Sequence, residues 1–526
     1  MNLELSAHPT QRPSRDLSLL KNVLVISGST ALSRILGLVR DVAIAHLFGA
    51  SRAYDAYLIA FMIPHLLRRL LAEGALSSAF IPLFTERLAR DGPQGATRFA
   101  NSVFTAALLF FPGLVLMGIV LAPFYVPFFA DGFSADQLAL TIRLTQITFP
   151  FIALVGLAAL VMGVLNSYER FFAPAFAPVL FNLGMIATAF ALAGFFAEPI
   201  YALAVGVLVG GLGQLLFQIP YLRDRWRYRP QLDLRDEGLY RLLKLILPSV
   251  VGLAIFQINS IVDNKLASRL AEGSISALQY AIRLFQLPLG LFVVSVGSVL
   301  LPRLAAHAAE KDTLAFVRTL RESVLFSLCI LLPATAGLFA LAGPIIQVLF
   351  EHGNFTREDT QLTVSALLNY LPGLIGYGGA YLLTRAFYAL HDTRTPLFVG
   401  GAAVALNVLL DYILVGPMGV GGLALATSLA GIVQALTLLI CLQRRLAPQP
   451  LLRDAEGRTA AKMLGAALVM GIATYLLTLW VSPLGEFCTV GLGVAFGVSF
   501  YSGLAWLGGF FMLRFKEKDS GIRGSL

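Results

Sequence analysis

Long uninterrupted apolar runs, rather than alternating apolar and polar positions, dominate the chain. A helix that spans a membrane needs about 20 mostly apolar residues, whereas the strands of a membrane barrel give short alternating segments. The pattern therefore predicts an all-α polytopic membrane protein with about 14 transmembrane helices. The expected spans are 22–48, 54–84, 99–124, 138–166, 173–197, 199–222, 240–267, 275–303, 317–345, 361–389, 396–416, 418–442, 460–482 and 486–513.

Basic residues gather in both terminal segments and in the even-numbered loops between these spans. Cytoplasmic loops carry an excess of Lys and Arg, so both termini are predicted to be cytoplasmic. Residues 1–16 are polar and do not form a cleavable signal, so the first span is expected to be retained. The odd-numbered loops contain almost no Lys or Arg; the exceptions are Arg52, Lys265, Arg269 and Arg357.

Composition agrees with a membrane protein, since 57% of the residues are hydrophobic and 13% are charged. A soluble domain this apolar would expose large adhesive patches, and disordered chains are poor in apolar groups. The formal net charge of +9 follows the loop alternation. We therefore expect the protein to be surrounded by membrane lipids and not to bind nucleic acid.

Prolines punctuate the two halves at matching positions. Pro150 and Pro372 lie in the fourth and tenth spans, and Pro174 and Pro396 open the fifth and eleventh with the same separation. Two six-helix repeats of equal orientation are predicted, as in transporters that rock two halves around a central site. The expected parts are an N-terminal lobe 1–222, a charged cytoplasmic linker 223–239, a C-terminal lobe 240–445, two extra helices 459–513 and a cytoplasmic tail 514–526.

Four arginines are predicted inside spans. Each would cost roughly 2.5–3.5 kcal/mol at the membrane centre, so exposure of all four to lipid would cost roughly 10–14 kcal/mol. They must face protein or water. Ion pairing with Asp41 and Glu73 is one interpretation, but it leaves two cations in surplus. A water-filled cationic cavity that binds a phosphorylated substrate is the other, and it uses Arg34, Arg40, Arg68 and Arg283.

Further polar residues share the helices that carry these arginines. Ser33, Gly37 and Arg40 fall at helical spacing on one face of the first span, and Gly37 permits close approach by a neighbour or a ligand. The second segment is too long for one span, and Pro64 and the Glu73–Gly74 stretch should kink or break it. Supporting roles are expected for Gly37, Asp55, Arg69 and Glu73.

Motifs of enzymes are absent from the sequence. It has no HExxH, no P-loop and no GxSxG, and its three cysteines lie far apart. We therefore expect a transporter and not an enzyme. An enzyme that acts on lipid-linked sugars remains the competing class, and it would need clustered carboxylates or histidines at a membrane face.

Several long motifs resemble those of the MurJ (MviN) lipid II flippases, within the multidrug/oligosaccharidyl-lipid/polysaccharide exporter superfamily. They are Ser33–Asp41, Phe48–Ala50, Asp55–Ala56, Pro64–Ala75, Leu165–Ser167, Pro174–Pro178 and Tyr280–Pro288. The resemblance implies a flippase that moves lipid II from the inner to the outer leaflet of the bacterial cytoplasmic membrane. It also implies two extra helices that form a groove for the lipid tail, and cavity residues Ser33, Arg34, Arg40, Asp41, Arg68 and Arg283. Ile282 and Gln286 depart from the acidic residues that some members have there.

A second set of oxygen-bearing side chains lies in the later spans. Oxygen ligands suit Na⁺ better than Zn²⁺, and some relatives place a sodium ion in this lobe. A hydrogen-bonded structural network is the alternative. No other cofactor is expected, and Na⁺, H⁺ and the membrane potential stay open as energy sources. The set is Asp263, Asn407, Asp411 and Thr427.

Two further transporter functions remain open. One is a flippase for another polyprenyl-pyrophosphate-linked oligosaccharide, and the other is a multidrug exporter of the same superfamily. We expect the protein to act as a monomer with lipid II as its substrate.

Overall fold

The computed structural model describes residues 13–70, 77–233, 235–255, 257–447, 449–451 and 454–510. Within these residues the regular structure is entirely helical, as predicted. Ten helical segments among them are long and apolar enough to cross a membrane. The expected total of about 14 stays a prediction, because the predicted spans 22–48, 54–84, 240–267 and 361–389 are not among the ten.

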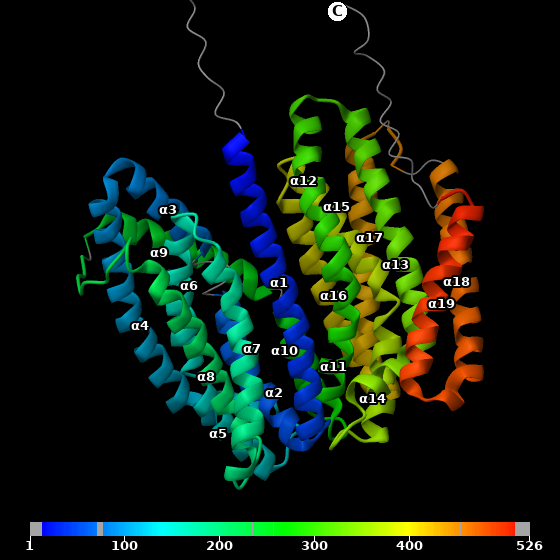
Figure 1. Cartoon of the computed structure of the whole chain (residues 1–526), viewed down its shortest axis with the longest axis horizontal. Helices are drawn as coiled ribbons and strands as arrows, with labels where there is room; N and C mark the ends of the chain where they lie inside the picture. The colour runs from blue at the N-terminus through cyan, green and yellow to red at the C-terminus, as the bar shows by residue number, and fades with distance from the viewer. Residues whose placement is uncertain are drawn as a thin grey trace, which may run out of the picture. The chain divides into compact units, whose positions relative to one another are not determined.

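The chain divides into two compact units. Unit 1 contains residues 52–257 and those before Gly49, and unit 2 contains 49–51 and everything from Ile258 on. The division falls within the predicted seventh span. Unit 1 comprises α1 (Pro13–Phe48), α2 (Arg52–Arg68), α3 (Ser77–Arg90), α4 (Gly92–Phe129), α5 (Ala135–Thr148), α6 (Phe151–Ser167), α7 (Phe172–Leu192), α8 (Tyr201–Gln218) and α9 (Glu237–Ile255) (Figure 1).

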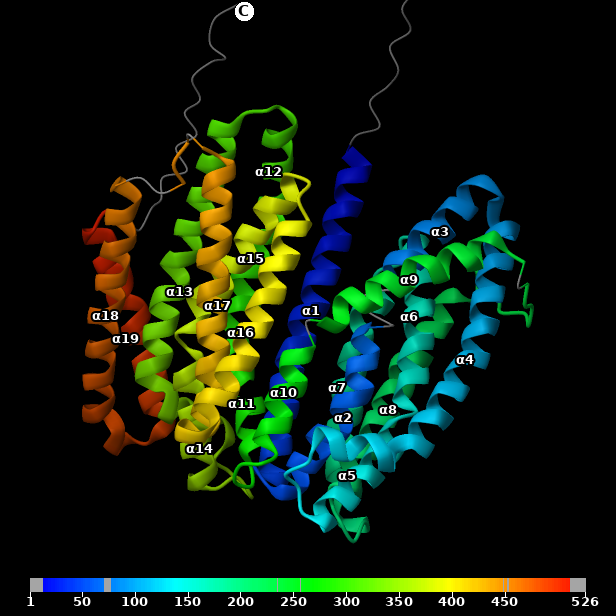
Figure 2. The same ribbon diagram turned by 180° about the vertical axis from the view of Figure 1, so that it is seen from behind.

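Unit 2 contains the remaining helices (Figures 1 and 2). α18 and α19 form a hairpin that packs along α13. The helices are α10 (Ile258–Ala267), α11 (Ser274–Pro288), α12 (Val294–Ala309), α13 (Thr313–Phe350), α14 (Arg357–Tyr370), α15 (Gly373–Ala389), α16 (Arg394–Met418), α17 (Val420–Arg445), α18 (Asp454–Val481) and α19 (Glu486–Leu507).

Two of the matching prolines interrupt helices at equivalent positions. α5 gives way to α6 at Phe149–Pro150, and α14 gives way to α15 at Leu371–Pro372. A proline has no backbone N–H to donate to the preceding helical turn, so both interruptions follow from the sequence. Pro64, by contrast, lies inside α2 and does not end it. The chain leaves the α-helix after Arg68, and the predicted break at residues 73–74 lies outside the described residues.

Small residues allow close helix packing, as is usual in membranes, where apolar side chains gain little by leaving lipid. A Cβ on Gly184 of α7 would lie 2.8 Å from the Cα of Gly210 on α8. A Cβ on Gly376 of α15 would lie 2.6 Å from the backbone nitrogen of Ile432 on α17. Any larger residue at these positions would separate the helices.

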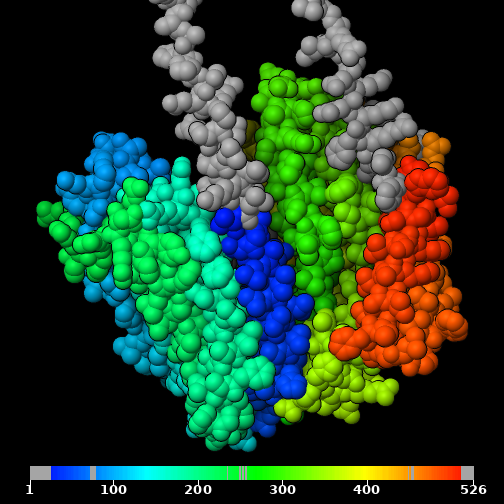
Figure 3. Space-filling model, in the orientation of Figure 1, coloured from blue at the N-terminus to red at the C-terminus, as the bar shows by residue number. Residues whose placement is uncertain are grey.

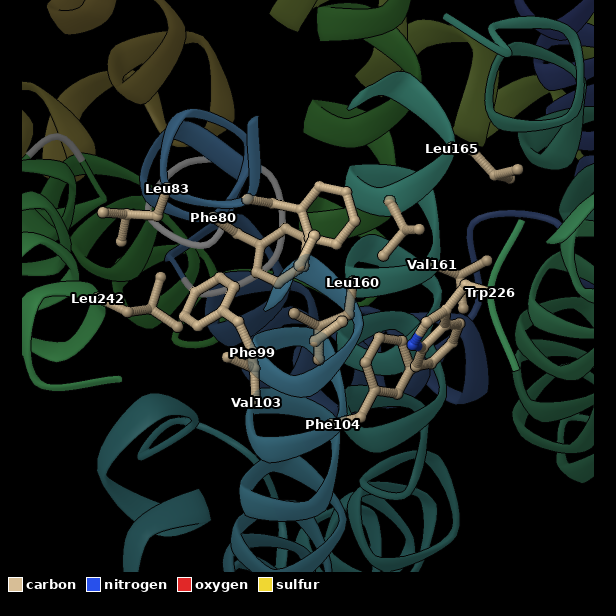
Figure 4. Packing of buried hydrophobic residues seen from close by; sticks show 14 of the residues in the cluster. Phe80, Leu83, Phe99, Val103, Phe104, Leu160, Val161, Leu165, Trp226 and Leu242 are labelled. Atoms are coloured by element: carbon tan, nitrogen blue, oxygen red, sulfur yellow. The ribbon is translucent and has the colours of Figure 1, made fainter. Parts of the chain in front are cut away.

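The charged linker before α9 is docked onto unit 1. Trp226 is buried, and its ring lies 4.5 Å from that of Phe104 on α4 (Figure 4). Its indole Nε1 donates to Oδ1 of Asn101 over 3.1 Å, and the backbone nitrogen of Arg229 donates to the same oxygen over 3.3 Å. The backbone nitrogen of Asp233 donates to Oγ of Ser102. These contacts hold Trp226, Arg229 and Asp233 of the linker against α4.

We expect Trp226→Ala to lower the stability of the detergent-solubilised protein by about 3–5 kcal/mol, because it empties a packed aromatic site. It also removes a hydrogen bond from a buried amide oxygen. Thermal unfolding monitored by near-UV circular dichroism would measure the change. Arg227→Ala, which truncates an exposed neighbour, should leave the midpoint unchanged. Equal shifts for both variants would contradict the docking.

Candidate functional site

Arg40 lies in a hydrogen-bonded network inside unit 1. Its NH2 and Nε groups contact Oδ1 of Asp41 at 2.7 and 3.1 Å, and its NH1 group donates to Oδ1 of Asn182 over 3.0 Å. Asn182, on α7, donates from Nδ2 to the backbone oxygen of Ser33 over 3.1 Å. Asp41 is 6% exposed. The network therefore ties α1 to α7 and fixes the direction of the Arg40 guanidinium.

This geometry bears on both interpretations of Arg40. Asp41 is its ion-pair partner, as the pairing interpretation requires. Arg carries five N–H donors, and these three hydrogen bonds use three of them. Two donors of the oriented guanidinium make no further hydrogen bond within the described residues, and the charge also interacts electrostatically with Tyr54 and Tyr57. Pairing and anion binding are thus compatible.

α2 carries a stack of aromatic rings that ends at Arg68. Ring centroids lie 5.9 Å apart for Tyr54 and Tyr57, 5.8 Å for Tyr57 and Phe61, and 5.5 Å for Phe61 and His65. NH2 of Arg68 lies 3.2 Å from Nε2 of His65. Since arginine can only donate, Nε2 of His65 is the acceptor if this contact is a hydrogen bond. The contact links Arg68 to the aromatic row of α2.

The other predicted site residues fall in different environments. Arg34 and Arg69 are exposed, Ser33 and Gly37 are half-buried, and Asp55 is 2% exposed. A Cβ on Gly37 would make only ordinary contact, 3.9 Å from Nδ2 of Asn182, so packing does not require glycine here. Glu73 lies outside the described residues. Arg283, on α11, is half-buried and belongs to unit 2, so its part in the site stays a prediction.

Sequence reasoning missed Asn182, His65 and Tyr57. Asn182 is a polar residue in the otherwise apolar α7, and this was the available signal. Its hydrogen-bond partners, Ser33 and Arg40, lie 149 and 142 positions earlier in the sequence, so no rule based on local spacing could reveal these contacts. The phenol oxygen of Tyr57 is buried and has no hydrogen-bond partner in the structure.

The second predicted set comes together in unit 2. Asn407 and Asp411 of α16 are fully buried, and Nδ2 of Asn407 lies 3.5 Å from Oδ1 of Asp411 and from Oγ1 of Thr427 on α17. Asp263 of α10 interacts electrostatically with Asp411. Four buried oxygens have no hydrogen-bond partner in the structure: Asn259 Oδ1, Asp263 Oδ1, Asn407 Oδ1 and Asp411 Oδ2.

These orphaned oxygens test whether the set fits a cation. A closed structural network would satisfy its buried acceptors, whereas a hard cation is bound by carboxylate and amide oxygens. Two carboxylates and two amides from α10 and α16 supply such ligands. Among the described residues no group of three or more His, Cys, Asp or Glu side chains that could hold a metal ion is found.

A solved structure shares the fold of this chain. An inward-facing multidrug resistance MATE family transporter of the MOP superfamily superimposes with a TM-score of 0.68 at 15% identity, covering 83% of this chain and 99% of that one. At this identity the likeness shows the fold alone.

Closer relatives define the family. The sequence model "Lipid II flippase MurJ" matches residues 44–500. "Lipid II flippase MurJ" of Burkholderia cenocepacia is 32% identical over 516 residues, covering 95% of this chain and all of that protein. The probable lipid II flippase of Vibrio cholerae is 36% identical over 424 residues, covering 78% of this chain and 80% of that protein. A structure titled "Lipid II flippase MurJ, inward closed conformation" gives a TM-score of 0.80 at 31% identity, covering 92% of this chain and 98% of that one. The chain belongs to the MurJ family and is a multi-pass membrane protein.

We expect Asn182→Leu to destabilise unit 1 by about 1–3 kcal/mol, because it leaves one donor of Arg40 without its acceptor and removes the side-chain bond to the Ser33 carbonyl. Thermal unfolding in detergent would measure the loss. Leu183→Ala, at an exposed neighbouring position on α7, is the control and should have a smaller effect. An unchanged midpoint for Asn182→Leu would show that the network does not hold α1 to α7.

Proposed function

We propose that this protein translocates lipid II, the lipid-linked peptidoglycan precursor, from the inner to the outer leaflet of the bacterial cytoplasmic membrane. The observation that carries the proposal is membership of the MurJ family over residues 44–500. The Arg40 network supports it, since an oriented guanidinium in an apolar helical unit suits a phosphorylated substrate. Both termini are proposed to be cytoplasmic, and the protein is proposed to act as a monomer without catalysing a reaction.

The proposed binding step uses the pyrophosphate of lipid II. Arg40, oriented by Asp41 and Asn182, offers its two remaining donors to phosphate oxygens. Arg68, backed by His65, is proposed as a second ligand and Arg283 as a third during the cycle. Ser33 and Arg34 are proposed to contact the sugar–peptide head.

Transport then requires that the substrate bind two states of the protein with different affinity. Neutralising the arginines lowers the cost of enclosing them away from water, so the loaded protein can close where the empty one cannot. The polyprenyl chain is proposed to stay among the apolar side chains of α13, α18 and α19. Alternating access around the loaded site would then deliver the head group to the outer leaflet.

We expect a protein with Arg40→Gln, Asp41→Asn, Arg68→Gln and Arg283→Gln to lose lipid II translocation while it remains folded. Asp41 is changed together with Arg40 because removal of one partner of a buried pair costs about 3–5 kcal/mol. The measurement is the leaflet position of lipid II in cells depleted of the native protein and supplied with the variant.

The control is Arg318→Gln, which removes an exposed arginine of α13. Full restoration of lipid II export by the quadruple variant would refute the proposed binding step. Export of a different polyprenyl-linked oligosaccharide, with lipid II left in the inner leaflet, would support the alternative substrate. Export of drugs alone would place the protein with the multidrug exporters.

We propose further that the oxygen cluster of unit 2 holds Na⁺ when the ion is bound. Asp263, Asn407, Asp411 and Thr427 would be its ligands, and the ion would supply the positive charge that lets two buried carboxylates stay ionised together. A proton shared by the two carboxyls is the alternative, and the membrane potential is a third energy source. The orphaned oxygens favour a bound cation.

We expect NaCl to raise the thermal unfolding midpoint of the purified wild-type protein relative to choline chloride at equal ionic strength, because a ligand that binds only the folded state stabilises it. Asp411→Asn should abolish the difference, and Asp136→Asn, on α5 of unit 1, should keep it. If the wild-type protein has the same unfolding midpoint in both salts, the proposed sodium site is refuted.

A further inference from the structure

Arg321 clamps the segment that connects α17 to α18. From its place near the start of α13, its NH2 group donates to the backbone oxygen of Pro450 over 2.7 Å and its Nε to that of Leu451 over 3.0 Å. Its NH1 group forms an ion pair with Oε1 of Glu456, in the first turns of α18, at 2.8 Å. All three nitrogens of one guanidinium therefore hold this connection.

The clamp differs from an ordinary surface ion pair. The side chains of Arg321 and Glu456 are 11% and 18% exposed. Arg318, one turn earlier on α13, pairs with Glu322 at 2.9 Å, but those side chains are 69% and 50% exposed. Exposed pairs contribute little, whereas shielded charge-assisted bonds are the strong ones. The Arg321 ion pair is therefore shielded from solvent, and the exposed Arg318 pair on the same helix serves as a matched control.

α17 holds the same connection from its other side. Nε2 of Gln443 donates to the backbone oxygen of Gln449 over 3.2 Å, and its Oε1 accepts from the backbone nitrogen of Leu451 over 2.6 Å. Leu451 is 4% exposed. The entry point of α18 is therefore fixed to two helices by polar contacts.

The rest of the α18–α19 hairpin rests mainly on apolar contact with α13. Met463, Met470 and Tyr501 pack in a cluster with Leu332. A Cβ on Gly471 would lie 3.0 Å from Cβ of Ala336. The orange and red surface of the hairpin lies at the edge of unit 2 in Figure 3. In a bilayer, such apolar contacts compete with equally apolar lipid chains, so they attach the hairpin without strongly fixing its position.

We propose that Arg321, through Glu456 and the backbone of residues 450–451, is a positioning residue that sets where α18 and α19 lie on α13 and thereby how the protein holds a long prenyl chain. This inference rests on the proposed function, in which these helices accommodate the lipid tail. Arg321 does not contact the substrate. Its effect is specific to the tail and absent for the head group.

The experiment compares full-length wild type, Arg321→Gln, Glu456→Gln and the double variant in nanodiscs, with Arg318→Gln as control. Hydrogen exchange of α18 amides reports the position of the hairpin. Native mass spectrometry reports binding of lipid II with an undecaprenyl tail and of the same head group on a farnesyl tail.

We expect faster exchange at the start of α18 and about a tenfold loss of undecaprenyl lipid II binding for Arg321→Gln, as for loss of a charge-assisted contact. Binding of the farnesyl compound should stay as in the wild type, and Arg318→Gln should match the wild type throughout. The double variant should lose no more than Arg321→Gln alone, because both residues belong to one contact.

Equal loss for both tails, or unchanged exchange in α18, would overturn the proposal. A wild-type protein that binds neither compound would count against lipid II as the substrate. In that case the exchange comparison still decides whether Arg321 positions the hairpin, so the two failures are distinguishable.

Discussion

The placement of guanidinium groups in an apolar helical protein constrains everything else in this molecule. An arginine cannot lose its proton at any physiological pH, so its charge must be met by partners wherever it lies. Arg40 meets this requirement with a carboxylate from its own helix and an amide from α7. The same contacts that make the charge tolerable also orient the guanidinium. In the proposed binding step, one set of contacts therefore both stabilises unit 1 and prepares Arg40 for an anionic substrate.

The sequence predicted those features that are local along the chain. Apolar runs of sufficient length gave the helical class, and prolines gave the interruptions at Phe149–Pro150 and Leu371–Pro372, because both depend on neighbouring residues alone. Pro64 shows the limit of this reasoning, since α2 continues through it. In a helix surrounded by other helices, a lost backbone bond can be compensated by neighbours. The effect of a proline is thus decided by packing that its sequence context does not contain.

In the candidate sites, too, the sequence predicted the features that depend on neighbouring residues and missed those that depend on distant ones. Asn407 and Asp411 are one helical turn apart, so their shared face was predictable. The structure places the predicted Thr427 beside Asn407 and adds the orphaned oxygen of Asn259. Arg40 and Asp41 were recognised as charges in a membrane helix, but Asn182 was not recognised as their partner. Arg321 was not singled out by the sequence at all. Its contacts lie about 130 residues further along the chain, and nothing in the local pattern separates it from Arg318.

Arg321 and Arg40 together indicate how a membrane transporter can be both mobile and specific. Apolar surfaces slide against each other in a bilayer at little cost, because lipid replaces whatever contact is lost. Polar contacts do not have this freedom, since a buried donor or acceptor left alone costs about 1–3 kcal/mol. The few polar contacts of each unit therefore decide which surfaces stay together, while the apolar remainder is left free to move. The network at α1 and α7 and the clamp at α13 and α18 are contacts of this kind, each joining two helices of one unit.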